Sequence, residues 1–202
     1  MNDNIKIAWF DMDGSLFDYD GHMRKFLFPL CSADEQELLA AKGLRACEAE
    51  YPHFKARMEL IKDLPGWWRS MPPLQEGFEV FQIARDMGFD CRVLTKGPSR
   101  ALIAWTEKVQ CCRDNLGETV HIAVVSSKSE VYGRVLYDDY PPYLSEWLEH
   151  RPRGLGIMPV NESNKDFADK NVVKFGGTNL HAVRAALQKA WDRKPKEPLV
   201  LA

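Results

Sequence analysis

The chain has 202 residues, of which 45% are hydrophobic, and its formal net charge is -2 at pH 7. A chain of this length can bury one substantial core with a small appended lobe, and the lack of a basic excess argues against a nucleic-acid polymer as partner. The five cysteines match no metal-binding spacing, so reduced thiols in the cytoplasm are expected. No apolar run approaches the roughly 18 residues of a membrane span, and residues 1–4 lack the basic segment of a signal peptide.

The first expected element is a short buried strand at residues 5–10, which breaks at once into Asp11-Met12-Asp13-Gly14-Ser15. A buried strand that ends in acids and a glycine is typical of a site at the carboxyl edge of a sheet. This strand therefore predicts both the start of a sheet and the place of its chemistry.

A helical insertion is expected next, because residues 21–72 carry helical patterns and no strand pattern. Ser32-Ala33-Asp34-Glu35 has the form of a capping box that opens a helix continuing toward Glu50, and a second helix is expected at residues 53–61. The predicted domains are a core at residues 1–20 and 73–193, a helical cap at 21–72 that covers the sheet edge, and a loose tail at 194–202.

The rest of the chain alternates between strand and helix patterns. This alternation predicts an α/β fold with a doubly wound, Rossmann-like parallel sheet. Right-handed crossovers would then bring the carboxyl ends of the strands to one edge. The further strands are expected at 91–94, 121–125, 134–137, 155–158 and 172–175, and the helices at 76–87, 99–109, 141–149 and 179–191.

Polar side chains follow four of these expected strands. Carboxylates brought together at one edge repel one another unless a cation lies among them. A set of hard oxygen ligands suits Mg²⁺, while a lysine and a threonine hydroxyl suit the oxygens of a phosphoryl group. The residues are Asp11 and Asp13, then Thr95, then Lys128, and then Asp138 and Asp139.

In this order and context, these residues resemble the four motifs of the haloacid dehalogenase-like (HAD) hydrolase superfamily. Within it, the sequence is most similar to the 5'(3')-deoxyribonucleotidases. The shared features are the opening Asp-Met-Asp-Gly with a further acid at Asp18, the ten-residue interval from Lys128 to Asp138, and the proline-containing turn at residues 138–141.

The resemblance implies a Mg²⁺-dependent phosphomonoesterase with a HAD-like core and a helical cap. Asp11 would attack phosphorus and form an aspartyl-phosphate, and Asp13 would protonate the leaving oxygen and then activate water. The Asp11 carboxylate, the Asp13 backbone carbonyl and the Asp138 carboxylate would hold Mg²⁺, with Asp139 supporting these ligands.

The resemblance also implies that Thr95, Lys96 and Lys128 bind phosphate, that the substrate is a nucleoside monophosphate, and that the protein can form a homodimer. Two positions depart from the nucleotidase pattern. Lys96 stands where serine is expected, and Tyr140 stands where arginine is expected. Both departures bear on the choice of substrate more than on phosphoryl transfer.

A substrate pocket is expected around the cap. Trp67 and Trp68 can stack on a base or form a hydrophobic plug between cap and core, and both interpretations stay open. The other pocket candidates each have a plainer structural interpretation: core packing for Phe17, a structural role for Asp18, and a solvated surface position for Arg69.

Three alternative functions remain at this point. The first is a phosphatase of sugar phosphates or other small phosphomonoesters. The second is a signalling receiver domain, which also combines acids, threonine or serine, and lysine on a parallel sheet but lacks a helical insertion after its first strand. The third is a binding protein with a decayed active site, which the presence of Asp11, Asp13, Lys128 and Asp138 disfavours.

Overall fold

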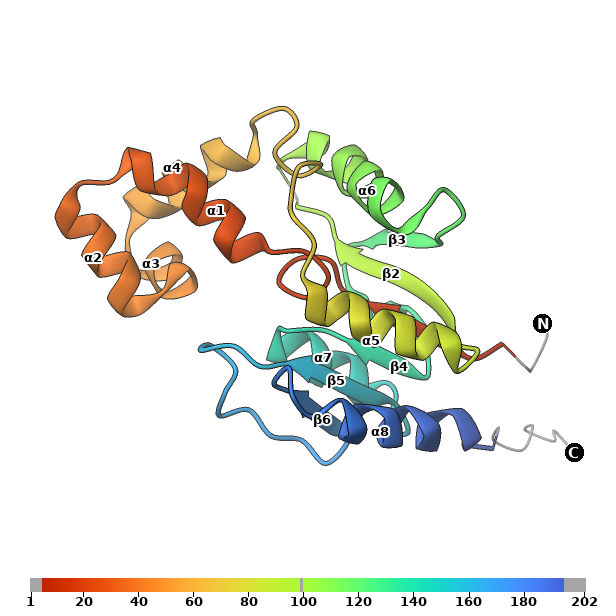
Figure 1. The fold of residues 1–202 in the computed structure, drawn as a ribbon. Coiled ribbons are helices and arrows are strands. Elements are labelled where there is room, and N and C mark those ends of the chain that lie inside the picture. Colours follow the sequence, from red (N-terminus) through yellow and green to blue (C-terminus); the bar gives the residue numbers. More distant parts are fainter. Residues whose placement is uncertain (1–4, 99, 195–202) are drawn as a thin grey trace, which may run out of the picture.

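The computed structural model describes residues 5–98 and 100–194, and it contains one sheet of six parallel strands in the order β3-β2-β1-β4-β5-β6 (Figure 1). The predicted doubly wound α/β fold is confirmed. Residues 195–202 of the predicted tail lie outside the described residues. Within the described ranges, no helix is both long and apolar enough to cross a membrane. The strands are β1 (Ile7–Phe10), β2 (Asp90–Lys96), β3 (Ile122–Val125), β4 (Val135–Tyr137), β5 (Leu155–Pro159) and β6 (Val172–Phe175).

Strand β1 lies at the centre of the sheet and sets the position of the site. Phe10 is paired with Val93 of β2 on one side and with Tyr137 of β4 on the other. The residues that follow Phe10 and Tyr137 are Asp11 and Asp138, so the two carboxylates leave adjacent strands at the same level. The backbone N–H of Asp11 still donates to the carbonyl of Tyr137 at 2.8 Å, which fixes this register.

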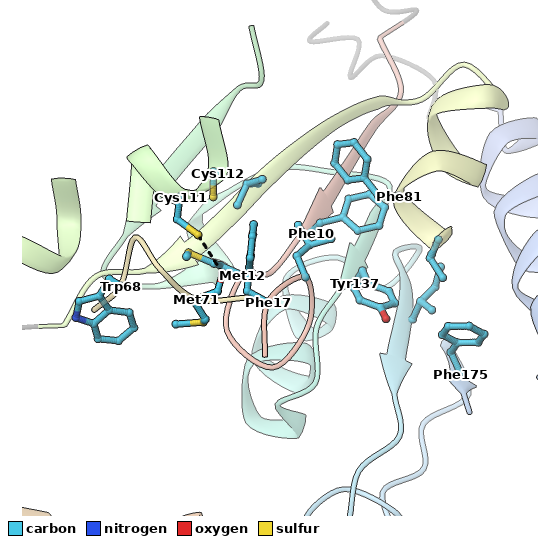
Figure 2. Packing of buried hydrophobic residues seen from close by; sticks show 14 of the residues in the cluster. Phe10, Met12, Phe17, Trp68, Met71, Phe81, Cys111, Cys112, Tyr137 and Phe175 are labelled. Atoms are coloured by element: carbon cyan, nitrogen blue, oxygen red, sulfur yellow. Dashed lines mark hydrogen bonds between the residues drawn. The ribbon is translucent and has the colours of Figure 1, made fainter. Parts of the chain in front are cut away.

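Helices cover both faces of the sheet, and the strands are hydrophobic on both sides as buried parallel strands require. Helices α5 (Gln75–Asp86) and α8 (Leu180–Asp192) share a core cluster with Phe10, while α7 (Pro141–Glu149) packs with Trp9 in a second cluster. Figure 2 shows the first cluster running from Trp68 through Met12 and Phe10 toward Phe175.

The insertion after β1 is all-helical, as predicted, and its helices gather beyond the carboxyl ends of the strands (Figure 1). The predicted capping box of Ser32 and Glu35 is present in both directions. The helix that it opens ends at Gly43 instead of continuing to Glu50, because Gly43 adopts a φ of 83° that breaks the helix. The elements are α1 (Tyr19–Leu27), η1 (Phe28–Leu30), α2 (Ala33–Lys42), α3 (Leu44–Glu50) and α4 (Pro52–Lys62).

Helix α6 (Leu102–Leu116) differs from its predicted range of 99–109. Pro98 does not start the helix; its carbonyl accepts a hydrogen bond from the Trp105 indole at 3.0 Å. At the other end the helix continues to Gly117, whose φ of 95° terminates it. The middle of the helix carries two buried charged residues, Glu107 and Lys108.

Candidate active site

Three residues predicted from separate strand ends lie in direct contact. The Lys128 ammonium is 2.5 Å from Oδ1 of Asp11 and 2.6 Å from Oδ2 of Asp138. All three side chains are buried, with Lys128 in the short helix η2 (Lys128–Glu130) after β3. A buried charge needs a partner to remain ionised, so this lysine between two carboxylates is the electrostatic centre of the site.

Asp139 joins the same cluster. Carboxylate oxygens of Asp11, Asp138 and Asp139 lie within 4.8 Å of one another. The Arg45 guanidinium, from α3 of the cap, donates to Oδ2 of Asp139 at 2.7 Å. Gly14 is required opposite it, because a Cβ there would come within 2.9 Å of Oδ2 of Asp139. The sequence assigned Asp139 only a supporting role, whereas its position also suits a direct metal ligand.

Asp13 lies beside a lysine that the sequence did not single out. Oδ2 of Asp13 forms an ion pair with Lys108 of α6, while its Oδ1 has no hydrogen-bond partner among the described residues. The same ammonium donates to Oγ1 of Thr95 at 3.0 Å and to the carbonyl of Lys96 at 3.1 Å. Thr95 is fully buried, so in this arrangement its hydroxyl serves Lys108. The predicted phosphate-binding role of Thr95 stays a prediction.

The pKa values of the clustered side chains differ from their ordinary values. Burial raises the pKa of Asp11 to about 8, with Lys128 opposing the shift and Asp138 adding to it. Burial likewise raises the pKa of Asp139 to about 7, against the lowering effect of Arg45. Burial alone would lower the pKa of Lys128, but the ion pairs with Asp11 and Asp138 outweigh it and hold that pKa above its usual value.

The donor set fits a divalent cation. Asp11, Asp138 and Asp139 offer hard carboxylate oxygens within 4.8 Å of one another in a buried cluster. Oxygen-only ligands of this kind favour Mg²⁺ over softer metals. These three carboxylates are therefore chemically suited to hold the expected Mg²⁺.

A cavity of about 810 Å³ opens onto the carboxylates. Asp11, Asp13 and Lys128 form part of its wall together with exposed Lys96, whose ammonium lies 5.2 Å from the ring centre of Tyr143. The cap contributes the opposite wall. The residues of that wall are Tyr19, Asp20, Arg45, Glu48, Lys62 and, from the segment after α4, Trp68.

Of the five predicted pocket residues, only Trp68 lines this cavity. Trp67 is buried at 1% exposure against His22 and Tyr19, as in the plug interpretation. Phe17 is fully buried in the core. Two polar candidates have structural partners: Asp18 caps α1 by accepting from the N–H of Gly21, and Arg69 pairs with Asp114 at 2.7 Å.

No protein-family model and no curated protein matches the sequence. Among solved structures, the chain is similar to a protein of Burkholderia xenovorans LB400 described as a haloacid dehalogenase-like hydrolase, with a TM-score of 0.52, 12% identity, and coverage of 91% of this chain and 96% of the other. This likeness shows a shared fold, as predicted from the motifs.

Two further structures give lower scores. A HAD hydrolase of family IA, variant 3, from Entamoeba histolytica HM-1:IMSS has a TM-score of 0.49 and 10% identity, covering 91% of this chain and 100% of that one. A Thermotoga maritima protein described as a beta-phosphoglucomutase has a TM-score of 0.45 and 15% identity, covering 91% and 97%.

Proposed function

We propose that the protein is a Mg²⁺-dependent phosphomonoesterase that uses Asp11 as a covalent nucleophile. The observation that carries this proposal is the contact of Asp11, Lys128 and Asp138, which follow three different strands. Asp11 and Lys128 line one cavity, and Asp138 lies buried behind them. Asp13, two residues after the nucleophile, lines the same cavity. Nucleophile, proton donor and phosphate-binding cation are thus within reach of one bound phosphomonoester.

The reaction follows from these positions in two displacements. A carboxylate oxygen of Asp11 attacks phosphorus while the bond to the leaving oxygen breaks, and Asp13 donates the proton that this oxygen takes up. Water then attacks the phosphorus of the aspartyl-phosphate, Asp13 accepts a proton from it, and inorganic phosphate leaves with Asp11 restored. Lys128 and Lys96 face the cavity and supply positive charge to the phosphoryl oxygens.

The metal ligands in this proposal are the carboxylates of Asp11, Asp138 and Asp139, with the backbone carbonyl of Asp13 as the further ligand expected from the sequence. Bound Mg²⁺ would neutralise charge on the phosphoryl oxygens and relieve the repulsion among the acids. Arg45 already neutralises part of the charge of Asp139 from the cap side.

The Asp138→Asn variant is expected to raise the Mg²⁺ concentration for half-maximal activity by about tenfold or more, because it removes a charged ligand. Asp166→Asn is a matched control, since it makes the same chemical change at an exposed residue. The measurement is phosphate release during a Mg²⁺ titration. An unchanged metal requirement in Asp138→Asn would argue against the ligand role.

Nucleoside monophosphates are the proposed substrates. The cavity wall beyond the acids carries aromatic rings from both sides, with Tyr19 and Trp68 near the cap and Trp105 from α6. Such rings can stack on a base, while the buried carboxylates mark where the phosphate lies. Glu48 and Lys62, an ion pair of 2.9 Å in the same wall, offer polar partners for a sugar or base.

The two neighbouring tryptophans provide a matched test of this pocket. Trp68→Ala is expected to raise KM for a nucleoside monophosphate by about tenfold, because it removes one stacking face, and to change KM for p-nitrophenyl phosphate much less. Both Trp67→Ala and Trp68→Ala are expected to lower the free energy of unfolding by about 3–5 kcal/mol, because the side chains are 1% and 3% exposed. Trp67→Ala should not show the substrate selectivity. Equal KM changes for both substrates in Trp68→Ala would contradict the stacking role.

A phosphate-release screen tests the proposal as a whole. Nucleoside monophosphates, sugar phosphates and p-nitrophenyl phosphate are compared with Mg²⁺ and with EDTA. We expect the highest kcat/KM for a nucleoside monophosphate and loss of all activity in EDTA. A clear preference for sugar phosphates would overturn the substrate class, and a lack of phosphate release from every ester would overturn the phosphatase.

A further inference from the structure

Helix α6 carries two adjacent charged residues that are both buried, Glu107 at 6% exposure and Lys108 at 1%. Charged side chains are rarely buried unless each is fully paired, because desolvation costs several kcal/mol. Neither residue belongs to the expected motifs. The hydrogen-bond and ion-pair partners of Glu107 and Lys108 therefore indicate how α6 supports the site.

Glu107 holds the segment that leads from the cap back to the core. Its carboxylate accepts from the backbone N–H of Gly66 at 2.6 Å and from that of Trp68 at 3.2 Å. These bonds join α6 to the segment that carries Trp68, a residue of the cavity wall. Lys108, the next residue, is thereby presented to the site from a rigid helix.

Lys108 has three N–H bonds and three acceptors: Oδ2 of Asp13, Oγ1 of Thr95 and the carbonyl of Lys96. The ammonium also lies 4.5 Å from the ring centre of Trp68. With every donor used inside the protein, Lys108 is not a free cation for phosphate. It ties the carboxylate of Asp13 to the end of β2.

The contact with Lys108 gives the two carboxylate oxygens of Asp13 different surroundings. Oδ2 is held by Lys108, whereas Oδ1 is buried and has no partner within the described ranges. An unpaired buried carboxylate oxygen is costly. The Asp13 side chain as a whole is 28% exposed and lines the cavity, so the ion pair with Lys108 fixes where this carboxyl group meets a bound ester.

We propose that Lys108 is a positioning residue that holds Asp13 by Oδ2, so that the carboxyl group of Asp13 stays where it gives the proton to the leaving group and later takes one from water. This inference rests on the proposed function and deepens it. It predicts that the importance of Lys108 depends on how much the leaving group needs a proton.

The chemistry of the leaving group makes this dependence measurable. A nucleoside alkoxide is a poor leaving group and needs protonation as the P–O bond breaks, whereas p-nitrophenolate is stable without a proton. Losing a well-placed acid therefore slows the first substrate much more than the second. A merely structural defect lowers both rates by the same factor.

The test compares Lys108→Met with the wild type on a nucleoside monophosphate and on p-nitrophenyl phosphate. We expect kcat to fall by about 10²-fold or more for the nucleotide and by less than about tenfold for p-nitrophenyl phosphate. The control Lys189→Met, at an exposed position of α8, should leave both rates unchanged. Equal losses on the two substrates would overturn the inference.

A second comparison covers the case in which Lys108→Met leaves Asp13 unpaired and the protein folds poorly. In Asp13→Asn the carboxylate that Lys108 pairs with is absent. Adding Lys108→Met to Asp13→Asn should therefore change kcat for either substrate by no more than about twofold, because Lys108 acts only through that carboxylate. If Lys108→Met lowered kcat by the same factor in the Asp13→Asn background as in the wild type, the inference would also be overturned. A wild type that releases phosphate from neither ester would instead sink the proposed function.

Discussion

The Asp11→Asn variant is expected to release phosphate at least about 10⁴-fold more slowly than the wild type, because an amide cannot replace the carboxylate as nucleophile. The substitution keeps the shape of the side chain and removes one of several crowded acids, so the fold should persist. Burial already raises the pKa of Asp11 to about 8, which shows how costly its charge is in this position. The measurement is steady-state phosphate release together with thermal unfolding.

Asp166→Asn serves again as the control for Asp11→Asn, since it makes the same chemical change at an exposed position. It should retain wild-type turnover. If a folded Asp11→Asn protein kept a tenth or more of the wild-type rate, Asp11 would not be the nucleophile.

The Lys128→Met variant is expected to lower the free energy of unfolding by about 3–5 kcal/mol in EDTA, because it leaves two buried carboxylates without their shared partner. Lys128 is 2% exposed and contacts both Asp11 and Asp138. Adding Mg²⁺ should recover part of this loss, since a cation bound to the folded state stabilises it and neutralises the same acids. Urea unfolding with and without Mg²⁺ measures both effects.

A surface lysine gives the matched control for Lys128→Met. Lys165 pairs with Glu162 at 3.2 Å, and both side chains are more than half exposed. Lys165→Met should therefore change the stability by no more than about 0.5 kcal/mol. If Lys128→Met lowered the free energy of unfolding by no more than Lys165→Met does, the buried lysine would not be what stabilises the two carboxylates.

The strand ends were predictable from the sequence because each combines two local signals. A short apolar run marks the strand, and the polar residues that follow it mark the edge of the sheet. For Asp11, Lys128 and Asp138 this reasoning brought residues far apart in the chain to one place, and the structure confirms their contact. The register of β1 between β2 and β4 is the physical reason.

Lys108 and Arg45 were not predictable in the same way. Arg45 lies in the first turn of α3 and Lys108 in the middle of α6, and a charged residue on a helix usually faces solvent. Arg45 meets Asp139 across 94 positions of sequence, and Lys108 meets Asp13 across 95. Such contacts depend on how the cap and α6 sit over the sheet, and no local pattern in the sequence encodes that placement.

The tryptophan pair shows a similar limit at the level of one side chain. Trp67 and Trp68 are adjacent and chemically identical, yet only Trp68 lines the cavity. They lie in an irregular segment that has neither the period of a helix nor that of a strand, so the sequence gives no rule for which ring points inward. In the structure the indole N–H of Trp68 donates to the carbonyl of Lys62 at 2.9 Å, and Glu107 holds its backbone N–H.

The most direct test of the account is to trap the phosphoryl group on the protein. A phosphomonoester radiolabelled at phosphorus is mixed with excess enzyme and Mg²⁺, quenched rapidly in acid, and the peptides are mapped. We predict label on the peptide that contains Asp11, none in EDTA and none in Asp11→Asn. Phosphate released with no labelled aspartate, or with the label on another residue, would contradict the account.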